Sequence, residues 1–322
     1  MKRFLFRLVL FMGVAAIGYA LLICVWGLIT PLVLRPNMPF LKGVYGHMHT
    51  RSHEVAEYGK VDILVLGSSR AYRGFDPRVF ESHGIRLFNL GSTAQSPVQS
   101  LMLARQHLQR LEPKLVLVEV GPEIFSSDGV ESGLDVLANN RVDKHSLAMA
   151  IQVNHVKIYN TLIYAWFRQA FDLDKDFVEP KVINEDAYVS GGFVEREISH
   201  HQPKSHVKIT RRELLKHQKQ ALEKLVAWLA HQGIDVILVE APTTAERFRS
   251  YANHDEFTNY LQEIAPFVSF NQSLNLNDSL HFYDASHLNQ NGVEKFNEAF
   301  ITRMAEEGWL APAGNLELHH SN

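Results

Sequence analysis

The sequence predicts an α/β protein built on an open parallel sheet and preceded by one transmembrane helix. Two observations predict the α/β class: short runs rich in Val, Ile and Leu recur along the chain, and amphipathic helical patterns lie between them. Strands that alternate with helices are typical of βαβ crossovers and of a doubly wound sheet covered by helices on both faces. A third observation, an uncharged run over residues 8–34, predicts the transmembrane helix.

The composition is that of a globular protein with ample core-forming residues. Hydrophobic residues make up 46% and charged residues 21% of the 322 positions, which excludes a disordered chain, a collagen-like repeat and a coiled coil. The formal net charge of -3 gives no basic field, so we expect no nucleic-acid partner. The single cysteine, Cys24, excludes an internal disulfide framework. His47, His49 and His53 lack a completing carboxylate or cysteine pattern, so we expect no metal and no cofactor.

Residues 1–34 are predicted to be a membrane anchor. Pro31 ends the helical part near Thr30, and about 23 residues at ~1.5 Å each give roughly 35 Å, enough to cross a bilayer core of ~30 Å. A cleaved signal peptide has a shorter apolar stretch of about 7–15 residues and a small-residue cleavage site, which we do not find here. The sequence therefore favours a retained single-pass anchor.

The cations around this helix predict its orientation. Lys2, Arg3 and Arg7 crowd the leading end, whereas only Arg35 and Lys42 follow soon after the helix. The positive-inside rule keeps the start of the chain cytoplasmic and exports the rest. We therefore expect an inner (cytoplasmic) membrane protein whose C-terminal domain is periplasmic or extracytoplasmic.

Beyond the anchor, the chain divides into a linker over 35–60, an α/β domain over 61–310 and a tail over 311–322. Five strands are predicted, at residues 61–66, 85–90, 115–120, 234–239 and 268–270. Continuous Val, Ile and Leu runs indicate strands that are buried on both faces, as in parallel sheets.

Two of the connecting helices have clear amphipathic patterns. They cover residues 100–111 and 211–232, and Gly233 fits the carboxyl cap of the second. The stretch of about 126–205 breaks the alternation, and we interpret it as an insertion that serves as a lid or docking element. Ligands of doubly wound sheets bind beyond the carboxyl ends of the strands, so the residues that follow each strand are the candidates for function.

A serine, a histidine and an aspartate at two of these positions predict acyl chemistry. Ser69 lies on the tight turn after the first strand, where backbone N–H groups and a helix start suit a developing oxyanion. Ser68 is the other candidate on this turn, and helix capping is its favoured role. Asp284 precedes His287 by three residues just ahead of a helix, so that the aspartate can orient the imidazole and the imidazole can take the serine proton.

Taken together, these motifs resemble the SGNH/GDSL hydrolase superfamily. The resemblance rests on Gly-Ser-Ser at 67–69, Phe-Asn-Leu-Gly at 88–91 and Asp-Ala-Ser-His at 284–287. It is strongest to the membrane-anchored, exported branch that is similar to the DltD protein of teichoic-acid D-alanylation and to the AlgJ and AlgX alginate acetylation proteins. The resemblance implies an SGNH-hydrolase-like, flavodoxin-like three-layer α/β/α fold.

Residue by residue, the resemblance implies Ser69 as the nucleophile, His287 as the base and Asp284 as the acid that orients it. It also implies the backbone N–H groups of Ser69 and Gly91 as oxyanion donors. The family's third donor, the asparagine of Gly-x-Asn-Asp, aligns with Glu123. An ionised glutamate accepts hydrogen bonds and cannot donate them, so the chain departs from the pattern here.

Four further residues are candidates for substrate binding. Arg70 and Arg73 follow the nucleophile, Asn89 ends the second strand and Glu123 follows the third. The alternative for the two arginines is a solvated helix face, and the alternative for Asn89 is hydrogen bonding to the backbone.

The sequence therefore predicts a serine O-acyltransferase that moves an acetyl or D-alanyl group to a cell-surface polysaccharide through an acyl-serine intermediate. The resemblance implies a membrane-bound acyl-carrying partner of the MBOAT type and a polysaccharide acceptor in the cell envelope. Two alternatives stay open. One is a polysaccharide acyl esterase, in which water is the acceptor, and the other is a catalytically silent SGNH-like adaptor for a membrane acyltransferase.

Overall fold

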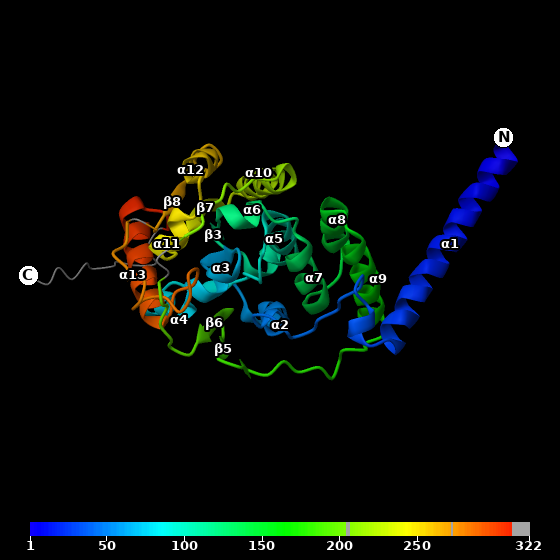
Figure 1. Cartoon of the computed structure of the whole chain (residues 1–322), viewed down its shortest axis with the longest axis horizontal. Helices are drawn as coiled ribbons and strands as arrows, with labels where there is room; N and C mark the ends of the chain where they lie inside the picture. The colour runs from blue at the N-terminus through cyan, green and yellow to red at the C-terminus, as the bar shows by residue number, and fades with distance from the viewer. Residues whose placement is uncertain (204–206, 272, 311–322) are drawn as a thin grey trace, which may run out of the picture.

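A five-stranded parallel sheet forms the centre of the protein (Figure 1). The computed structural model describes residues 1–203, 207–271 and 273–310. The strand order is β2-β1-β3-β7-β8, and every neighbouring pair in it is parallel. The strands are β1 (Ile63–Leu66), β2 (Leu87–Asn89), β3 (Leu115–Glu119), β7 (Asp235–Glu240) and β8 (Phe267–Ser269). All five predicted strands are therefore present.

The two faces of the sheet are buried in separate cores. Leu64 and Leu66 of β1 pack in one core, while Ile63 and Val65 pack in the other. This alternation follows from the two-residue period of a strand, and it explains why the strand sequences are apolar throughout. The predicted three-layer α/β/α arrangement is confirmed.

Helices from different parts of the chain cover each face. The first core is covered mainly by α2 (Met48–Tyr58), α5 (Pro97–Leu111), α7 (Val130–Asn139), α8 (Lys144–Val153), α9 (Val156–Ala170), α10 (Lys216–His231) and α12 (His254–Gln262). The second is covered by α3 (Ser69–Gly74), α4 (Pro77–Ser82) and α13 (Gln290–Glu307). Two short helices, α6 (Pro122–Phe125) and α11 (Ala245–Arg249), follow β3 and β7.

Two segments differ from the sequence prediction. The helix expected over 211–232 begins only at Lys216, because Arg212 exchanges hydrogen bonds with the side chain of Asn253 and the segment before the helix is extended. The expected linker over 35–60 contains α2, whose Met48 and Val55 are fully buried in the first core. The expected tail over 311–322 lies outside the described residues.

The insertion over about 126–205 has two structurally different parts. Its helices α7, α8 and α9 contribute Val136, Met149 and Ile158 to the first core, so they are part of the main body. Its second part is a small antiparallel sheet of β4 (Val182–Ile183), β5 (Asp186–Val189) and β6 (Phe193–Arg196), and β6 lies against α3. Of these two parts, the sheet is the one that contacts the helix carrying Ser69.

The N-terminal helix α1 (Lys2–Ile29) projects from the body beside α9 (Figure 1). Within the described part of the chain, it is the one helix that is long and apolar enough to cross a membrane. The Tyr19 hydroxyl donates to Asn160 Oδ1 over 2.6 Å, and the Tyr164 hydroxyl donates to the Gly27 carbonyl over 2.8 Å. The last turns of α1 are thus held by side chains of α9, while the short η1 (Leu32–Leu34) leads back to the body.

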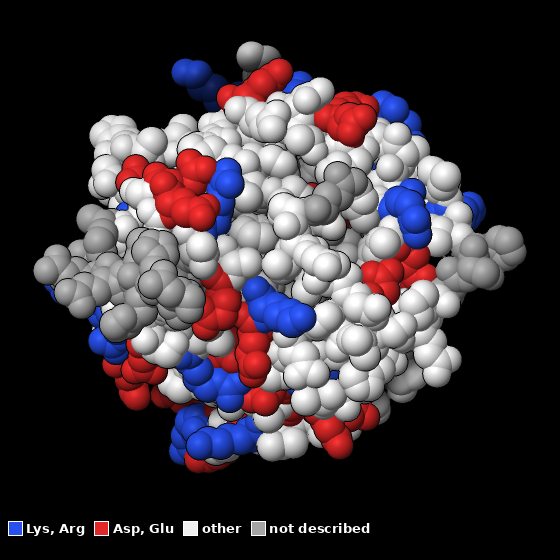
Figure 2. Space-filling model, turned by 90° about the vertical axis from the view of Figure 1, so that its left-hand side faces the viewer, with Lys and Arg blue, Asp and Glu red and all other residues white. Residues whose placement is uncertain are grey.

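Charge is mixed on the surface over α13. Acidic and basic side chains lie interspersed on the face that Figure 2 shows. This pattern agrees with the small net charge of the sequence.

Candidate active site

Ser69 is the first residue of α3, directly after the turn that ends β1. Gly67 makes this turn at φ 144°, and a Cβ on Gly67 would lie 2.5 Å from the Cβ of Glu119. The side chain of Ser68 caps α3 by accepting the N–H of Arg70. The side chain of Ser68 is therefore occupied in capping the helix, and Ser69 is the serine of this turn whose hydroxyl is available for other contacts.

The structure brings Ser69, His287 and Asp284 into one hydrogen-bonded series. Ser69 Oγ lies 2.7 Å from His287 Nε2, although 218 positions separate the two residues in the chain. On the other side of the ring, His287 Nδ1 lies 2.9 Å from Asp284 Oδ2 and 3.0 Å from Oδ1. These distances are those of a general base hydrogen-bonded both to its nucleophile and to the group that orients it.

Asp284 is held as a carboxylate. Burial by itself raises its pKa, but hydrogen bonds from His287 and from the backbone N–H groups of Ser286 and His287 bring the pKa below its ordinary value. A carboxylate only accepts hydrogen bonds, so Nδ1 of His287 carries the proton. Nε2 is then left as the acceptor that faces Ser69.

Stacked side chains support the imidazole from its flat face. The rings of Tyr283 and His287 are almost parallel, with centroids 5.4 Å apart. The guanidinium of Arg196 lies over Tyr283 at 4.8 Å and that of Arg73 at 5.8 Å. Arg73 donates two hydrogen bonds, of 2.8 and 2.6 Å, to Asp186 of β5. The small sheet of the insertion is thereby tied to the helix that carries Ser69.

Of the two predicted oxyanion donors, the N–H of Ser69 has no partner within its helix and the N–H of Gly91 is already hydrogen-bonded. Ser69 is the first residue of α3, so its N–H has no carbonyl partner within the helix. The N–H of Gly91 donates to Asn89 Oδ1 over 3.0 Å and is already occupied. Asn89 is fully buried and donates to the carbonyls of Ala71 and Phe75, so it binds backbone and not substrate.

A buried network of charged side chains lies beneath the turn that carries Ser69. Glu119, at the end of β3, accepts from both the N–H and the hydroxyl of Ser68, at 2.9 and 2.7 Å. Arg70 Nη2 lies 3.0 Å from Glu119 Oε1 and 3.0 Å from Glu123 Oε1. The hydroxyl of Tyr251 donates to the other oxygen of Glu123 over 2.8 Å. The turn thus rests on two carboxylates that share one guanidinium.

The charges of this network stabilise one another. Burial favours the neutral form of Glu123, but Arg70 and Arg247 lower its pKa below the usual value. Burial disfavours the charged form of Arg70, yet Glu119 and Glu123 raise its pKa. Among the described residues, Nη1 and Nε of Arg70 have no hydrogen-bond partner. Arg70 also lines a small pocket together with His287 and Ala241.

The site therefore holds residues that the sequence prediction included and others that it missed. Arg73, predicted to bind substrate or face solvent, is instead buried and paired with Asp186. Glu119, Tyr251 and Tyr283 were not predicted. Glu119 had a sequence signal, because a carboxylate at the end of an apolar strand is almost never buried without a partner.

The three histidines near α2 are not gathered at one point. Among the residues that the structure describes, no three of His, Cys, Asp and Glu are placed to hold a metal ion. The rings of His49 and His53 lie 4.1 Å apart, whereas His47 faces Tyr188.

Comparisons with known proteins give matches to solved structures only. No protein-family profile matches the sequence, and no curated protein matches it. The fold is similar to a GDSL-like lipase from Bacteroides thetaiotaomicron, with 12% identity over 82% of this chain and 98% of that chain and a TM-score of 0.41. It is also similar to a lipase/acylhydrolase from Enterococcus faecalis, with 13% identity, coverage of 79% and 99% and a TM-score of 0.40.

A third similar structure is a catalytic mutant of Axe2, an acetylxylan esterase from Geobacillus stearothermophilus. It shares 13% identity, the match covers 76% of this chain and 95% of that chain, and the TM-score is 0.38. At these identities the similarity concerns the fold alone.

Proposed function

We propose that this protein is a serine-dependent acyl-ester enzyme of the SGNH type that works through an acyl-serine intermediate. One observation carries the proposal: the hydroxyl of Ser69 lies 2.7 Å from an imidazole whose other nitrogen is bound to a carboxylate. This arrangement activates a serine hydroxyl as a nucleophile.

The proposed reaction has two steps. Ser69 Oγ attacks the acyl carbonyl carbon while His287 Nε2 takes the hydroxyl proton, and the tetrahedral intermediate expels the alcohol, which receives that proton. An acceptor hydroxyl then loses its proton to His287 and attacks the acyl-serine. The new ester leaves, and the proton returns from His287 to Ser69. Asp284 holds the Nδ1 proton throughout both steps.

We assign the stabilisation of the oxyanion to the N–H of Ser69 and to Arg70. Glu123 occupies the place of the family's asparagine and cannot donate, but it holds a guanidinium that has only donors. Nη1 and Nε of Arg70 lack partners among the described residues. Donors that are fixed in a dry site stabilise developing negative charge most strongly.

The acceptor that we propose is a hydroxyl group of a cell-surface polysaccharide, acylated with an acetyl or D-alanyl group. Two features support it: α1 is suited to anchor the site beside a membrane, and Asp284 is half exposed, so the triad is open on one side to a large molecule. We propose an exported domain on a cytoplasmic-membrane anchor because Lys2, Arg3 and Arg7 precede the apolar part of α1. The membrane-bound acyl-carrying partner is proposed from the resemblance of the sequence motifs alone.

The nucleophile is tested by a fluorophosphonate label and intact mass measurement. Wild type should gain one label, Ser69→Ala should gain none, and Ser68→Ala should still react because Ser68 serves the backbone. Labelling of Ser69→Ala equal to that of wild type would overturn the assignment.

Transfer and hydrolysis are separated by product analysis with an activated acetyl ester as donor. With an oligosaccharide present, the proposal expects acetylated sugar to exceed free acetate. Release of acetate alone, unchanged by the sugar, would establish an esterase and reject the proposed transfer.

One observation favours a second candidate function, that of a catalytically silent adaptor. The N–H of Gly91 is occupied by Asn89, which leaves the oxyanion site with fewer donors than the family pattern supplies. This reading expects no label on folded wild-type protein at any concentration of the probe.

A further inference from the structure

A large polar cavity lies on the opposite side of the body from Ser69. Its volume is about 900 Å³, and it lies between α2, the last turns of α5, the end of α7 and the segment that follows α9. The final residues of α2 and α5 lead into the starts of β1 and β3, so the cavity is near the amino ends of the strands. Ser69 lies beyond the carboxyl ends. The cavity is therefore separate from the candidate active site.

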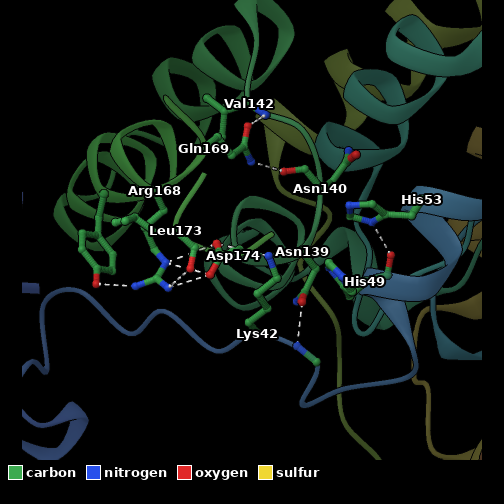
Figure 3. Close-up of polar contacts among 12 residues, drawn as sticks. Lys42, His49, His53, Asn139, Asn140, Val142, Arg168, Gln169, Leu173 and Asp174 are labelled. Carbon is green, nitrogen blue, oxygen red and sulfur yellow. Dashed lines mark hydrogen bonds and ion pairs between the residues drawn. The ribbon is translucent and has the colours of Figure 1, made fainter. Parts of the chain in front are cut away.

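The lining of this cavity carries more positive than negative side chains. Its cations are Lys42, Arg110, Arg141, Arg168 and Lys175, and its carboxylates are Glu57, Asp172 and Asp174. Asp174 is shared by Lys42 Nζ at 3.1 Å and by Arg168 Nη2 at 2.6 Å (Figure 3). Because the single carboxylate of Asp174 pairs with both Lys42 and Arg168, this part of the cavity lining has a net positive charge.

Two histidines of the lining have ring nitrogens without partners. His49 is 8% exposed, and its Nδ1 forms no hydrogen bond within the described part of the chain. Nε2 of His107 is also buried and also lacks a hydrogen-bond partner there. Burial, followed by neighbouring positive groups, lowers the pKa of each to about 4, so both rings are neutral at pH 7. Buried polar atoms of this kind are normally satisfied by a ligand or by water.

Lys42 and His49 converge on the same part of the cavity. Lys42 Nζ lies 5.4 Å from the ring centre of Phe177, and the ring of His49 meets the same phenyl ring edge-on at 4.9 Å. His53 packs against His49 and donates from Nδ1 to the His49 carbonyl over 2.8 Å, which fixes the pair (Figure 3). An ammonium group beside an imidazole nitrogen that lacks a hydrogen-bond partner is a fitting surface for an oxyanion.

Hydrogen bonds link the lining of the cavity to the C-terminal end of α1. Arg168 Nη1 donates to the Tyr164 hydroxyl over 2.8 Å, and this hydroxyl donates to the carbonyl of Gly27. If α1 spans a membrane, its last turn lies near the lipid headgroups. Phosphate groups are the common anions at that depth.

From these contacts we propose that the cavity binds a phosphate-bearing ligand, with the phosphate between Lys42 and His49. The shared chemistry is a phosphate group, and its source is either the headgroup of a membrane lipid or a free phosphate ester. The site does not depend on the acyl chemistry, so the two proposals fail separately.

The test uses the full chain in a non-ionic detergent. Thermal unfolding is followed while inorganic phosphate replaces chloride at constant ionic strength, and native mass spectrometry measures retained lipid after mixing with phosphatidylglycerol or phosphatidylcholine vesicles. A ligand that binds only the folded state raises the unfolding midpoint. We expect phosphate to raise the midpoint, or phosphatidylglycerol to be retained in preference to phosphatidylcholine; the first result indicates a free phosphate ester and the second a lipid.

Lys42→Met and His49→Gln test the location of the site. Asp174 keeps Arg168 as a partner in Lys42→Met, so this variant should fold. Each substitution should weaken the binding about tenfold or more, because a hydrogen bond to a charged group is worth about 1.5–3 kcal/mol. The exposed Lys224→Met on α10 is the matched control and should bind like wild type.

Two results would overturn the proposal. The first is a wild-type protein that shows no phosphate shift and no preference for the anionic lipid. The second is binding that Lys42→Met and His49→Gln leave unchanged, because the ligand then lies elsewhere.

Discussion

Arg70 is the residue on which the proposed catalysis departs most from the SGNH pattern that the sequence motifs resemble. Its guanidinium occupies the space beside Gly121, where a Cβ would lie 1.8 Å from Nη2. It is buried between two carboxylates, and its Nη1 and Nε have no partner among the described residues. The rigid fork of an arginine reaches several acceptors at once, which a lysine ammonium does not.

Arg70→Lys should therefore lower kcat while KM changes little. A lysine keeps one positive charge for Glu119 but loses the donors that we assign to the oxyanion, and loss of one such donor costs about 10²–10³ in kcat. Steady-state kinetics with an activated acetyl ester measure the effect, and thermal unfolding checks the fold. Arg78→Lys on α4 is the control and should keep its kcat. An Arg70→Lys variant that is folded and fully active would remove Arg70 from the mechanism.

At this scale the sequence predicted which three polar side chains meet better than it predicted their surroundings. Ser69, Asp284 and His287 stand out because short motifs place all three after predicted strands or before a helix. The occupied N–H of Gly91 was not predictable, because it depends on the side-chain conformation of Asn89. The pairing of Arg73 with Asp186 joins segments 113 positions apart, and no local pattern encodes it.

The turn between β1 and α3 is the element that positions Ser69, the proposed nucleophile. Gly67 has a positive φ and lies against Glu119, so it meets two separate requirements for glycine. Gly84 also has a positive φ, of 72°, but no heavy atom lies within 4 Å of its missing Cβ. A side chain at Gly84 would therefore cause backbone strain alone, whereas a side chain at Gly67 would cause both backbone strain and steric overlap with Glu119.

Gly84→Ala should lower the free energy of unfolding by about 1–2 kcal/mol, the cost of a left-handed conformation. Gly67→Ala should lose a further ~1–3 kcal/mol through overpacking, and its fluorophosphonate labelling should slow because the turn shifts. Urea unfolding in detergent and the labelling rate measure these effects. Equal losses for both variants would show that Glu119 does not constrain the turn.

The small sheet of the insertion is held to α3 by Arg73 and Asp186. Burial alone would raise the pKa of Asp186, but the hydrogen bonds and charge of Arg73, together with Arg196, bring it below the ordinary value. A carboxylate whose folded pKa is depressed stabilises the protein above its unfolded pKa of about 3.9, and this contribution is lost as the pH falls through the folded pKa.

Asp186→Asn should therefore be less stable than wild type by about 1.5–3 kcal/mol at pH 7. The difference should persist down to about pH 4 and shrink below it, as Asp186 becomes protonated in wild type. Denaturant unfolding over this pH range measures the difference, and the exposed Glu185→Gln is the control. A difference that is independent of pH would exclude an ionised Asp186 as the origin of the effect.

Among the elements, the strands were predicted closely and the insertion was not. Continuous apolar runs mark strands covered on both faces, and the alternation of Leu64 and Val65 between the two cores explains why the runs carry no polar face. Helices α7 and α8 pack onto α5, and α9 packs onto α7 and α8, through contacts between distant segments. The expectation of a lid or docking element over this whole stretch therefore does not describe these three helices, which belong to the main body.

In the whole molecule, α1 and the body meet along α9. A Cβ on Gly27 would lie 2.3 Å from the ring of Tyr164, whereas nothing lies within 4 Å of Gly18. The contact depends on this glycine, since the hydroxyl of Tyr164 also binds the carbonyl of the same residue.

Gly27→Leu should therefore separate the end of α1 from α9, and Gly18→Leu should not. We expect faster proteolysis between residues 30 and 42 in detergent for Gly27→Leu, with an unchanged pattern for Gly18→Leu. Equal protection of both variants would show that the helix is held by other contacts. The exposed Trp166 on α9 offers a fluorescence signal for the same experiment.

The contact between Tyr164 and Gly27 has a consequence for how the proposed anchored enzyme would meet its substrates. A catalytic domain on a flexible linker can reach many heights above a bilayer. A domain that is packed against its own membrane helix, as α9 is against α1, would hold its site at one height. In the proposed reaction, polymer chains would then be acylated only where they pass at that height, so the spacing of acyl groups along a polymer would reflect the geometry of α1 and its contact with α9.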